Sequence, residues 1–171
     1  MRGTLKLSLM PRGWPRFALA LAAYVAMLPC MAATTCTTTA TGVAFGLYNP
    51  LSGTPNNTTG SVSVRCQLVD ENFARVNYTV ALSTGASNSF VNRTLRSGAN
   101  PLNYNLYTNA AHTQIWGNGS GATAAPTGRI NLSRFAPIAQ NDLTIYGSIP
   151  AAQYNVVPGS YTDTIVVTVT Y

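Results

Sequence analysis

The chain ends in the stretch Gly159-Ser-Tyr-Thr-Asp-Thr-Ile-Val-Val-Thr-Val-Thr-Tyr171, which decides the fold. Pro158 and Gly159 form a turn signal, and β-branched residues then alternate with a period of two, as in a strand. Terminal residues usually fray unless a sheet holds them. We therefore expect the apolar face of this strand to be buried in the core or to be covered by a protein that binds it. That face carries Ile165, Val167, Val169 and Tyr171, and the opposite face carries Thr164, Val166, Thr168 and Thr170.

Other short segments with the same alternation precede the terminal strand. Turns rich in Gly, Pro and Asn separate them, and no segment shows a helical period. Short strands with closely spaced turn signals predict one all-β domain, an antiparallel β-sandwich. The segments are residues 37–45, 61–68, 75–82, 90–95, 102–107, 129–135 and 143–149. Their expected inward residues include Val62, Val64 and Cys66, then Val76, Tyr78, Val80 and Leu82, then Leu102, Tyr104 and Leu106.

Residues 1–32 are expected to be a secretory signal peptide rather than part of the fold. Basic residues occur up to Arg16, an apolar segment covers residues 17–28, and small residues follow it. This order is typical of a peptide that is cleaved on export, here after Ala32 or the alanine that follows. The mature domain is therefore predicted to cover residues 33–171.

Two other interpretations of the N-terminal segment are less favourable. Its apolar part is shorter than the ~20 residues of a membrane-spanning helix. Leu28-Pro29-Cys30 resembles a lipid-attachment site, but Pro29 beside the cysteine is a poor match. Plain cleavage remains the expected outcome.

The net charge of the predicted mature domain is small. The full chain carries +6, but four of its ten basic residues lie in the predicted signal peptide. Six arginines and four carboxylates remain, so the mature domain carries +2 and has no lysine. This charge offers no basis for binding nucleic acid or acidic membranes.

Two cysteines remain once Cys30 is removed with the signal peptide, namely Cys36 and Cys66. An even pair in an exported domain predicts a disulfide, because the compartment is oxidising. A metal site is the alternative for paired cysteines, but His112 is the single histidine available as a further ligand. We therefore expect no metal and no other cofactor.

No pattern of residues in the chain indicates an enzyme. Asp70 and Glu71 are adjacent and point apart in an extended segment, whereas a catalytic carboxylate pair must converge on its substrate. His112 lies in a polar stretch, which is typical of a solvated loop. Asp142 and Asp163 are isolated, and Asp163 is expected to be an outward charge on the terminal strand.

Several motifs together resemble a known family. They are Cys36-Thr-Thr-Thr-Ala-Thr-Gly-Val-Ala-Phe-Gly-Leu-Tyr-Asn-Pro-Leu-Ser-Gly, Gly60-Ser-Val-Ser-Val-Arg-Cys66, Leu102-Asn-Tyr-Asn-Leu-Tyr-Thr-Asn-Ala-Ala with Ile115-Trp-Gly-Asn-Gly, and Tyr146-Gly-Ser-Ile-Pro with Pro158-Gly-Ser-Tyr-Thr-Asp-Thr. The chain resembles the spore coat protein U domain, which is also found in Csu-type archaic chaperone–usher pilins. The resemblance covers nearly the whole mature chain. It implies an immunoglobulin-like sandwich that lacks one strand and is completed by a donor strand.

The resemblance also implies partners. In that family a periplasmic chaperone lends a strand during export, and the N-terminal extension of the next subunit replaces it in the pilus. The implied partners are thus a periplasmic chaperone, an outer-membrane usher and neighbouring pilin subunits. An open sheet edge accepts such a strand by β-augmentation. The expected surface for the chaperone or donor strand consists of Ile165, Val167, Val169 and Tyr171.

The predicted mature N-terminus limits the role of the protein in a pilus. A donor strand needs roughly ten residues, or about 33 Å of extended chain. With cleavage after Ala32, three residues precede Cys36, and they reach at most ~11 Å. We therefore expect an adhesive or structural subunit that accepts a strand but donates none, exported to the periplasm and then to the cell surface. The alternative is a free-standing secreted binding or coat-matrix module whose sandwich is self-complete.

Overall fold

The computed structural model describes residues 34–171, and the predicted signal peptide lies outside the described residues. The described chain forms eight strands and a 3-10 helix, η1 (Gly85–Ser87), and all strand pairs in it are antiparallel. The strands are β1 (Thr34–Thr41), β2 (Asn56–Leu68), β3 (Phe73–Leu82), β4 (Arg93–Ser97), β5 (Asn100–Tyr107), β6 (Thr127–Ser133), β7 (Ile138–Ile149) and β8 (Val167–Thr170).

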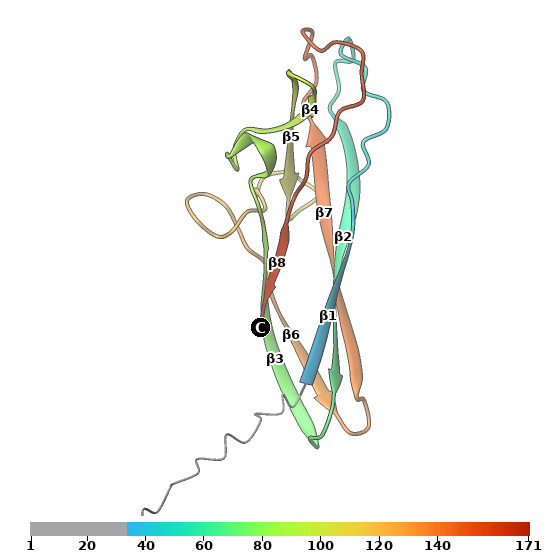
Figure 1. The fold of residues 1–171 in the computed structure, drawn as a ribbon, viewed down its shortest axis with the longest axis vertical. Coiled ribbons are helices and arrows are strands. Elements are labelled where there is room, and N and C mark those ends of the chain that lie inside the picture. Colours follow the sequence, from blue (N-terminus) through green and yellow to red (C-terminus); the bar gives the residue numbers. More distant parts are fainter. Residues whose placement is uncertain (1–33) are drawn as a thin grey trace, which may run out of the picture. The chain divides into compact units, whose positions relative to one another are not determined.

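The strands form two sheets that face each other as a sandwich (Figure 1). One sheet has the strand order β1-β2-β7-β5-β4, and the other has the order β6-β3-β8. The long pairing of β2 with β7 forms the centre of the larger sheet, and β3 forms the centre of the smaller one. The predicted all-β antiparallel sandwich is therefore confirmed.

The core lies between the central strands of the two sheets. Val64 of β2 and Val80 of β3 have no exposed surface, and Trp116 is also buried, donating from Nε1 to the carbonyl oxygen of Val80 at 3.0 Å. Period-two alternation places the two valines inward, because one face of each antiparallel strand packs on the core and the other meets water. The predicted inward residues of the three best-patterned segments are all buried: Val62, Val64, Cys66, Val76, Tyr78, Val80, Leu82, Leu102, Tyr104 and Leu106.

The terminal strand is shorter than its sequence predicts. Extended pairing was expected from Gly159 onward, but the ladder with β3 covers only Val167–Thr170. β3 ends at Leu82, and the chain then turns into η1, so earlier residues lack a neighbour in that sheet. Thr162 instead makes an isolated bridge to Arg96 of β4. The segment before β8 thus passes from an edge of the larger sheet to an edge of the smaller one.

β2 begins earlier than predicted, at Asn56, within a stretch that reads as turn-rich. The start of β2 pairs with the end of β7, where Asn56 lies opposite Ile149. Asn56 Nδ2 also donates to the carbonyl oxygens of Phe45 at 3.0 Å and Leu47 at 3.2 Å. These long-range contacts turn a locally weak strand former into part of the sheet.

Arg93 lies fully buried at the start of β4, although arginine is almost never fully buried unless it is paired. Its guanidinium donates to Asn105 Oδ1 at 2.9 Å, to the carbonyl oxygen of Ser83 at 2.7 Å and to that of Trp116 at 2.9 Å. Burial is the main cause that lowers its pKa. Arg93 therefore ties the end of β3 and a loop to β4 and β5.

Cys36 and Cys66 form a disulfide with an Sγ–Sγ distance of 2.03 Å. The two residues lie directly opposite each other in the pairing of β1 with β2. Cys66 is fully buried, so the bridge ties the edge strand β1 to the core.

Replacing both cysteines by alanine should lower the free energy of unfolding of the mature protein by roughly 3.5–4 kcal/mol, because the bridge closes a loop of 30-residue sequence separation and restricts the unfolded chain. Denaturant titration of the double variant against the unsubstituted protein measures this difference. Mass spectrometry of unreduced mature protein should find no thiol that can be alkylated. Two alkylatable cysteines in material purified from the periplasm would contradict the assignment.

Candidate functional site

Each sheet of the sandwich ends, on the same side of the molecule, in a strand whose outer edge is unpaired. β1 lies at the end of the larger sheet and pairs with β2, and β8 lies at the end of the smaller sheet and pairs with β3. Figure 1 shows β1 and β8 running along the same side of the sandwich. No ladder of the described chain joins β1 to β8. Two open edges of this kind are sites at which a further strand can add.

The backbone of β8 directs alternate hydrogen-bonding groups away from β3. Ser83 N donates to the carbonyl oxygen of Val166 at 2.9 Å, which sets the alternation of the pair. The two threonines of β8 therefore direct their N–H and C=O groups toward β3. Val167 and Val169 direct theirs to the opposite side, where no strand of the described chain pairs with them. β8 thus presents donors and acceptors along an open edge.

The same alternation opens the edge of β1. Leu68 N donates to the carbonyl oxygen of Pro137 at 2.8 Å, so Cys66, two residues earlier, also directs its backbone groups toward β7. Cys36 lies opposite Cys66 and therefore directs its own N–H and C=O groups away from β2. Tyr171 Oη donates to the carbonyl oxygen of Cys36 at 3.4 Å, which places the end of β8 beside β1.

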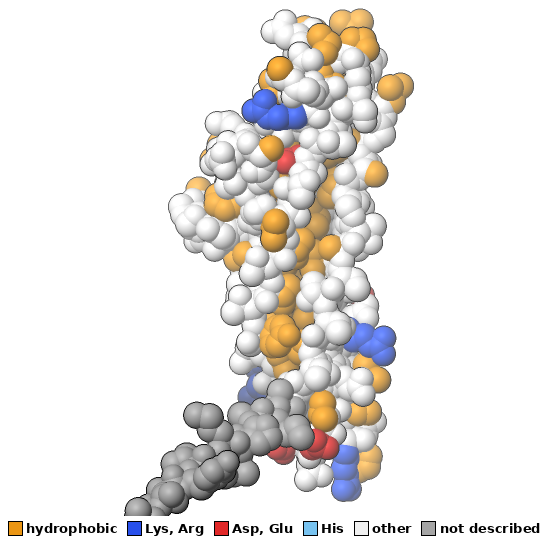
Figure 2. All heavy atoms as spheres, viewed as in Figure 1, with side chains coloured by type: hydrophobic (Ala, Val, Ile, Leu, Met, Phe, Trp, Pro, Cys, Tyr) orange, Lys and Arg blue, Asp and Glu red, His pale blue; other side chains and the backbone are white. Residues whose placement is uncertain are grey.

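An apolar groove lies between these two edges. Figure 2 shows a band of apolar side chains that runs along this side of the molecule. Ile165, Val167 and Val169 contribute to it and pack half-buried against the core. Residues 37–41 of β1 are exposed on both faces of the strand. The two sides of the groove, formed by β1 and β8, therefore offer surface that an added strand would cover.

Tyr171 is the most exposed residue of the expected contact face. Its side chain is 64% exposed, whereas the other three residues of the predicted contact face are half-buried. The ladder with β3 ends at the pair of Thr79 and Thr170, so the last residue has no neighbouring strand to hold it. Its ring reaches instead toward Cys36 at one end of the groove.

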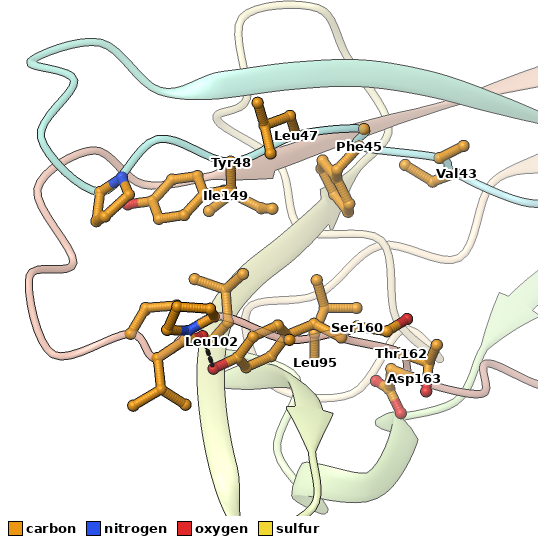
Figure 3. Close-up of a pocket in the computed structure, with 18 residues that line it drawn as sticks. Val43, Phe45, Leu47, Tyr48, Leu95, Leu102, Ile149, Ser160, Thr162 and Asp163 are labelled. Atoms are coloured by element: carbon orange, nitrogen blue, oxygen red, sulfur yellow. Dashed lines mark hydrogen bonds between the residues drawn. The ribbon is translucent and has the colours of Figure 1, made fainter.

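The groove widens into a cavity of about 880 Å³ at its other end. This cavity lies between residues 43–50 and residues 156–163. In Figure 3, Phe45 and Tyr48 lie on one wall, and Leu95 lies on the opposite side with the segment that leads to β8. The sequence pattern of the first segment predicts a strand up to Phe45 and then a turn, and it does not indicate a wall of the site.

The first wall rests directly on the larger sheet. A Cβ atom at Gly147 of β7 would lie 2.5 Å from Val43 Cγ1 and 2.9 Å from Phe45 Cζ, so the missing side chain allows the close approach. The ring of Phe45 also meets the ring of Tyr104 edge to face, with 5.8 Å between centroids. Residues 43–45 are thus held over the sheet although they form no strand.

Asp163 anchors the second wall. Its carboxylate accepts hydrogen bonds from Tyr104 Oη at 2.6 Å and from the backbone N–H groups of Ala86 at 2.9 Å and Thr164 at 2.8 Å. Gly85, with φ of 69°, leaves the room that this carboxylate occupies. Burial, and then the hydrogen bond to Asp163, raises the pKa of Tyr104, so the phenol keeps its proton and donates the hydrogen bond to this carboxylate. The outward position expected for Asp163 is therefore wrong, because these donors hold it half-buried.

The expected solvated position of His112 is wrong, because its half-buried ring packs edge to face against the rings of Tyr107 and Tyr146, with 5.1 Å and 6.4 Å between centroids. Asp142 is exposed on β7, where hydrogen bonds from Ser63 and Gln140 lower its pKa. Within residues 34–171, no group of three or more His, Cys, Asp or Glu side chains is placed to hold a metal ion. The described part of the chain also contains no helix long and apolar enough to cross a membrane.

Comparison with known proteins gives a consistent result. Residues 22–168 match the Spore Coat Protein U domain family. Protein U of Myxococcus xanthus is 31% identical over 134 residues, which are 74% of this chain and 70% of that protein.

Among solved structures, a similar chain occurs in the CsuC-CsuE chaperone–tip adhesion subunit pre-assembly complex from the archaic chaperone-usher Csu pili of Acinetobacter baumannii. The TM-score is 0.51 at 21% sequence identity, and the match covers 81% of this chain. It covers 40% of that chain, so the present protein spans about two fifths of its structural neighbour. The likeness concerns the fold.

Removing the Asp163 carboxylate should destabilise the wall of the groove. Asp163→Ala leaves the partly buried Tyr104 hydroxyl and the Ala86 N–H without this acceptor, and an unpaired buried polar group costs about 1–3 kcal/mol. Urea denaturation measures the loss, and Asp142→Ala is the matched control because that carboxylate is exposed. Equal stability of the two variants would contradict the anchoring role.

Proposed function

This chain belongs to the Spore Coat Protein U domain family, and from that premise we propose that it is an exported, non-enzymatic pilus subunit whose groove accepts a strand from a partner protein. The observation that carries the proposal is the apolar groove between the open edges of β1 and β8. Each edge directs backbone donors and acceptors into it, from Cys36 on one side and from Val167 and Val169 on the other.

An added strand would satisfy two needs of this groove at once. Its backbone would pair with the open edges, and alternate side chains would fill the apolar floor and the cavity beside Phe45. Ile165, Val167 and Val169 are the floor residues in this proposal, and Tyr171 is a contact at the groove's end that the incoming strand displaces or packs against.

The proposed donors are a periplasmic chaperone during export and a neighbouring subunit after assembly at an outer-membrane usher. The solved complex with a similar fold pairs a chaperone with a tip adhesion subunit, which supports this choice of partners. Residues 1–32 act in this proposal as a cleaved signal peptide, and residues 33–171 form the assembled domain at the cell surface.

Within a pilus, we assign the protein an acceptor role. Cys36 is covalently fixed to β2, so the chain that could leave this domain as a donor is limited to the residues before it. If cleavage follows Ala32, that segment is too short and has no large apolar side chain. N-terminal sequencing of the mature protein must accompany any test. Strand exchange in which this N-terminus fills a partner's groove would overturn the acceptor assignment.

One observation favours the alternative, a free-standing coat-matrix or binding module with a self-complete sandwich. Tyr171 already reaches across to the carbonyl oxygen of Cys36, so the groove is bridged at one end without a partner. Protein U, the relative from Myxococcus xanthus, is similar to this chain across most of both proteins. In the alternative, no partner strand is required for stability.

Paired substitutions on the two faces of β8 separate these functions. Val169→Lys places a charge on the groove floor, where its desolvation opposes strand insertion, whereas Thr168→Lys places the same charge on the exposed face. When the tagged protein is co-expressed with the proposed periplasmic chaperone, we expect Val169→Lys to reduce co-purification at least roughly tenfold, a loss of about 1.4 kcal/mol in binding. Thr168→Lys should leave co-purification unchanged. Equal recovery of both variants would contradict the groove as the binding site.

A further inference from the structure

The loop over residues 116–124 projects from the sandwich on a fixed base (Figure 1). Gly117 N donates to the carbonyl oxygen of Ala124 at 2.8 Å, and Leu82 N at the end of β3 donates to the carbonyl oxygen of Gly117 at 3.0 Å. Residues 118–122 form the tip of the loop, and all of them are exposed. The contacts at the base therefore hold the loop in place while water reaches its tip.

The tip contains the dipeptide Asn118-Gly119, the single place in the chain where glycine follows asparagine. An asparagine side chain can cyclise when the backbone nitrogen of the next residue attacks its amide carbon. Glycine favours this attack, because it has no Cβ atom beside the nitrogen. Gly119 has a φ of 84°, and a Cβ atom placed on it would meet nothing closer than Ala125 Cβ at 3.7 Å, apart from its chain neighbours. The surrounding structure therefore leaves the dipeptide open.

Hydrogen bonds from Ser120 polarise the Asn118 amide. Asn118 Oδ1 accepts from Ser120 N at 3.0 Å and from Ser120 Oγ at 2.6 Å. Donors aimed at an oxygen stabilise the negative charge that develops on it when its carbon is attacked. Thr123 Oγ1 donates to the carbonyl oxygen of Ser120 at 2.8 Å, which holds Ser120 in place. Within residues 34–171, no hydrogen bond holds Asn118 Nδ2 or Gly119 N, so the leaving nitrogen and the attacking nitrogen are both free.

We propose that Asn118 modifies itself by deamidation through a cyclic imide. Gly119 N forms a bond to Asn118 Cγ, the bond from Cγ to Nδ2 breaks, and ammonia leaves with the proton that Gly119 N loses. Water then adds to either carbonyl carbon of the ring and opens it, which leaves aspartate or isoaspartate at this position. The net reaction consumes water and releases ammonia without any change of oxidation state.

Other exposed asparagines of the chain lack this combination of features. Asn100 precedes Pro101, which has no N–H and cannot act as the nucleophile. Asn88 precedes Ser89, whose Cβ atom stands beside the attacking nitrogen. The structure therefore singles out Asn118 as the reactive asparagine.

The modification does not depend on the proposed strand-accepting groove. The tip of the loop contributes no residue to the lining of the cavity and none to β1 or β8. The new carboxylate lowers the net charge of the predicted mature domain by one, from +2 to +1. The reaction would therefore produce a second charge form of the protein whether the groove is empty or filled.

Incubation of purified mature protein in neutral buffer, followed by peptide mapping with tandem mass spectrometry, tests the proposal. We expect deamidation at Asn118 to be about tenfold or more faster than at Asn88 and Asn100, with both aspartate and isoaspartate as products. Ser120→Ala removes the hydroxyl donor and should slow the reaction about threefold or more. Ser52→Ala is the matched control, since Ser52 Oγ accepts from Thr54 N at 3.2 Å in a turn of a different loop.

The same protein in guanidinium chloride separates the effect of the structure from that of the dipeptide. Denaturation removes the Ser120 donors from Oδ1, so we expect Asn118 to react faster in the folded protein than in the denatured one. An equal or slower reaction in the folded protein would overturn the proposal, as would aspartate without isoaspartate, which indicates direct hydrolysis. Equal rates in the Ser120→Ala and Ser52→Ala variants would refute the part assigned to Ser120.

Discussion

The structure depends on a backbone constraint, namely that the groups on the outer side of β8 have no partner in the described chain. Hydrogen bonding to β3 uses the N–H and C=O groups of alternate residues, and those of Val167 and Val169 therefore face the groove. An edge of this kind in contact with apolar surface is a template for another strand. A strand supplied by a partner would form hydrogen bonds with the unpaired N–H and C=O groups of β8. The side chains of the same strand would cover the apolar floor of the groove.

The two walls of the groove are held by different means. β1 is fixed to the core by the Cys36–Cys66 disulfide, so its edge cannot leave the sheet. β8 is held over only four paired residues, with Asp163 tying the preceding segment to Tyr104 and to η1. The disulfide therefore fixes β1 at the end of the groove beside Tyr171, and Asp163 fixes the segment before β8 at the wide end, where the cavity lies.

The sequence predicted what depends on local periodicity and missed what depends on distant partners. Alternation identified the inward faces of β2, β3 and β5, because a strand's side-chain period is a property of the strand itself. It missed the start of β2, since Asn56 becomes a strand residue through its pairing with Ile149. Arg93 could not be placed in the core from its sequence position, because its three acceptors come from separate parts of the chain. The wall formed by Phe45 was missed for a similar reason, as it depends on Gly147, a hundred positions away in the sequence.

Amide hydrogen exchange of the isolated, monomeric mature protein, followed by NMR, tests the open edge most directly. Backbone amides bonded to a neighbouring strand exchange slowly, and unpaired amides at an edge exchange quickly. An open edge on β8 predicts slow exchange at Thr168 and Thr170, whose groups face β3, and fast exchange at Val167 and Val169, which become protected once a strand is bound. Equal protection of all four amides in the isolated monomer would mean that the sandwich completes itself, and it would contradict the open edge.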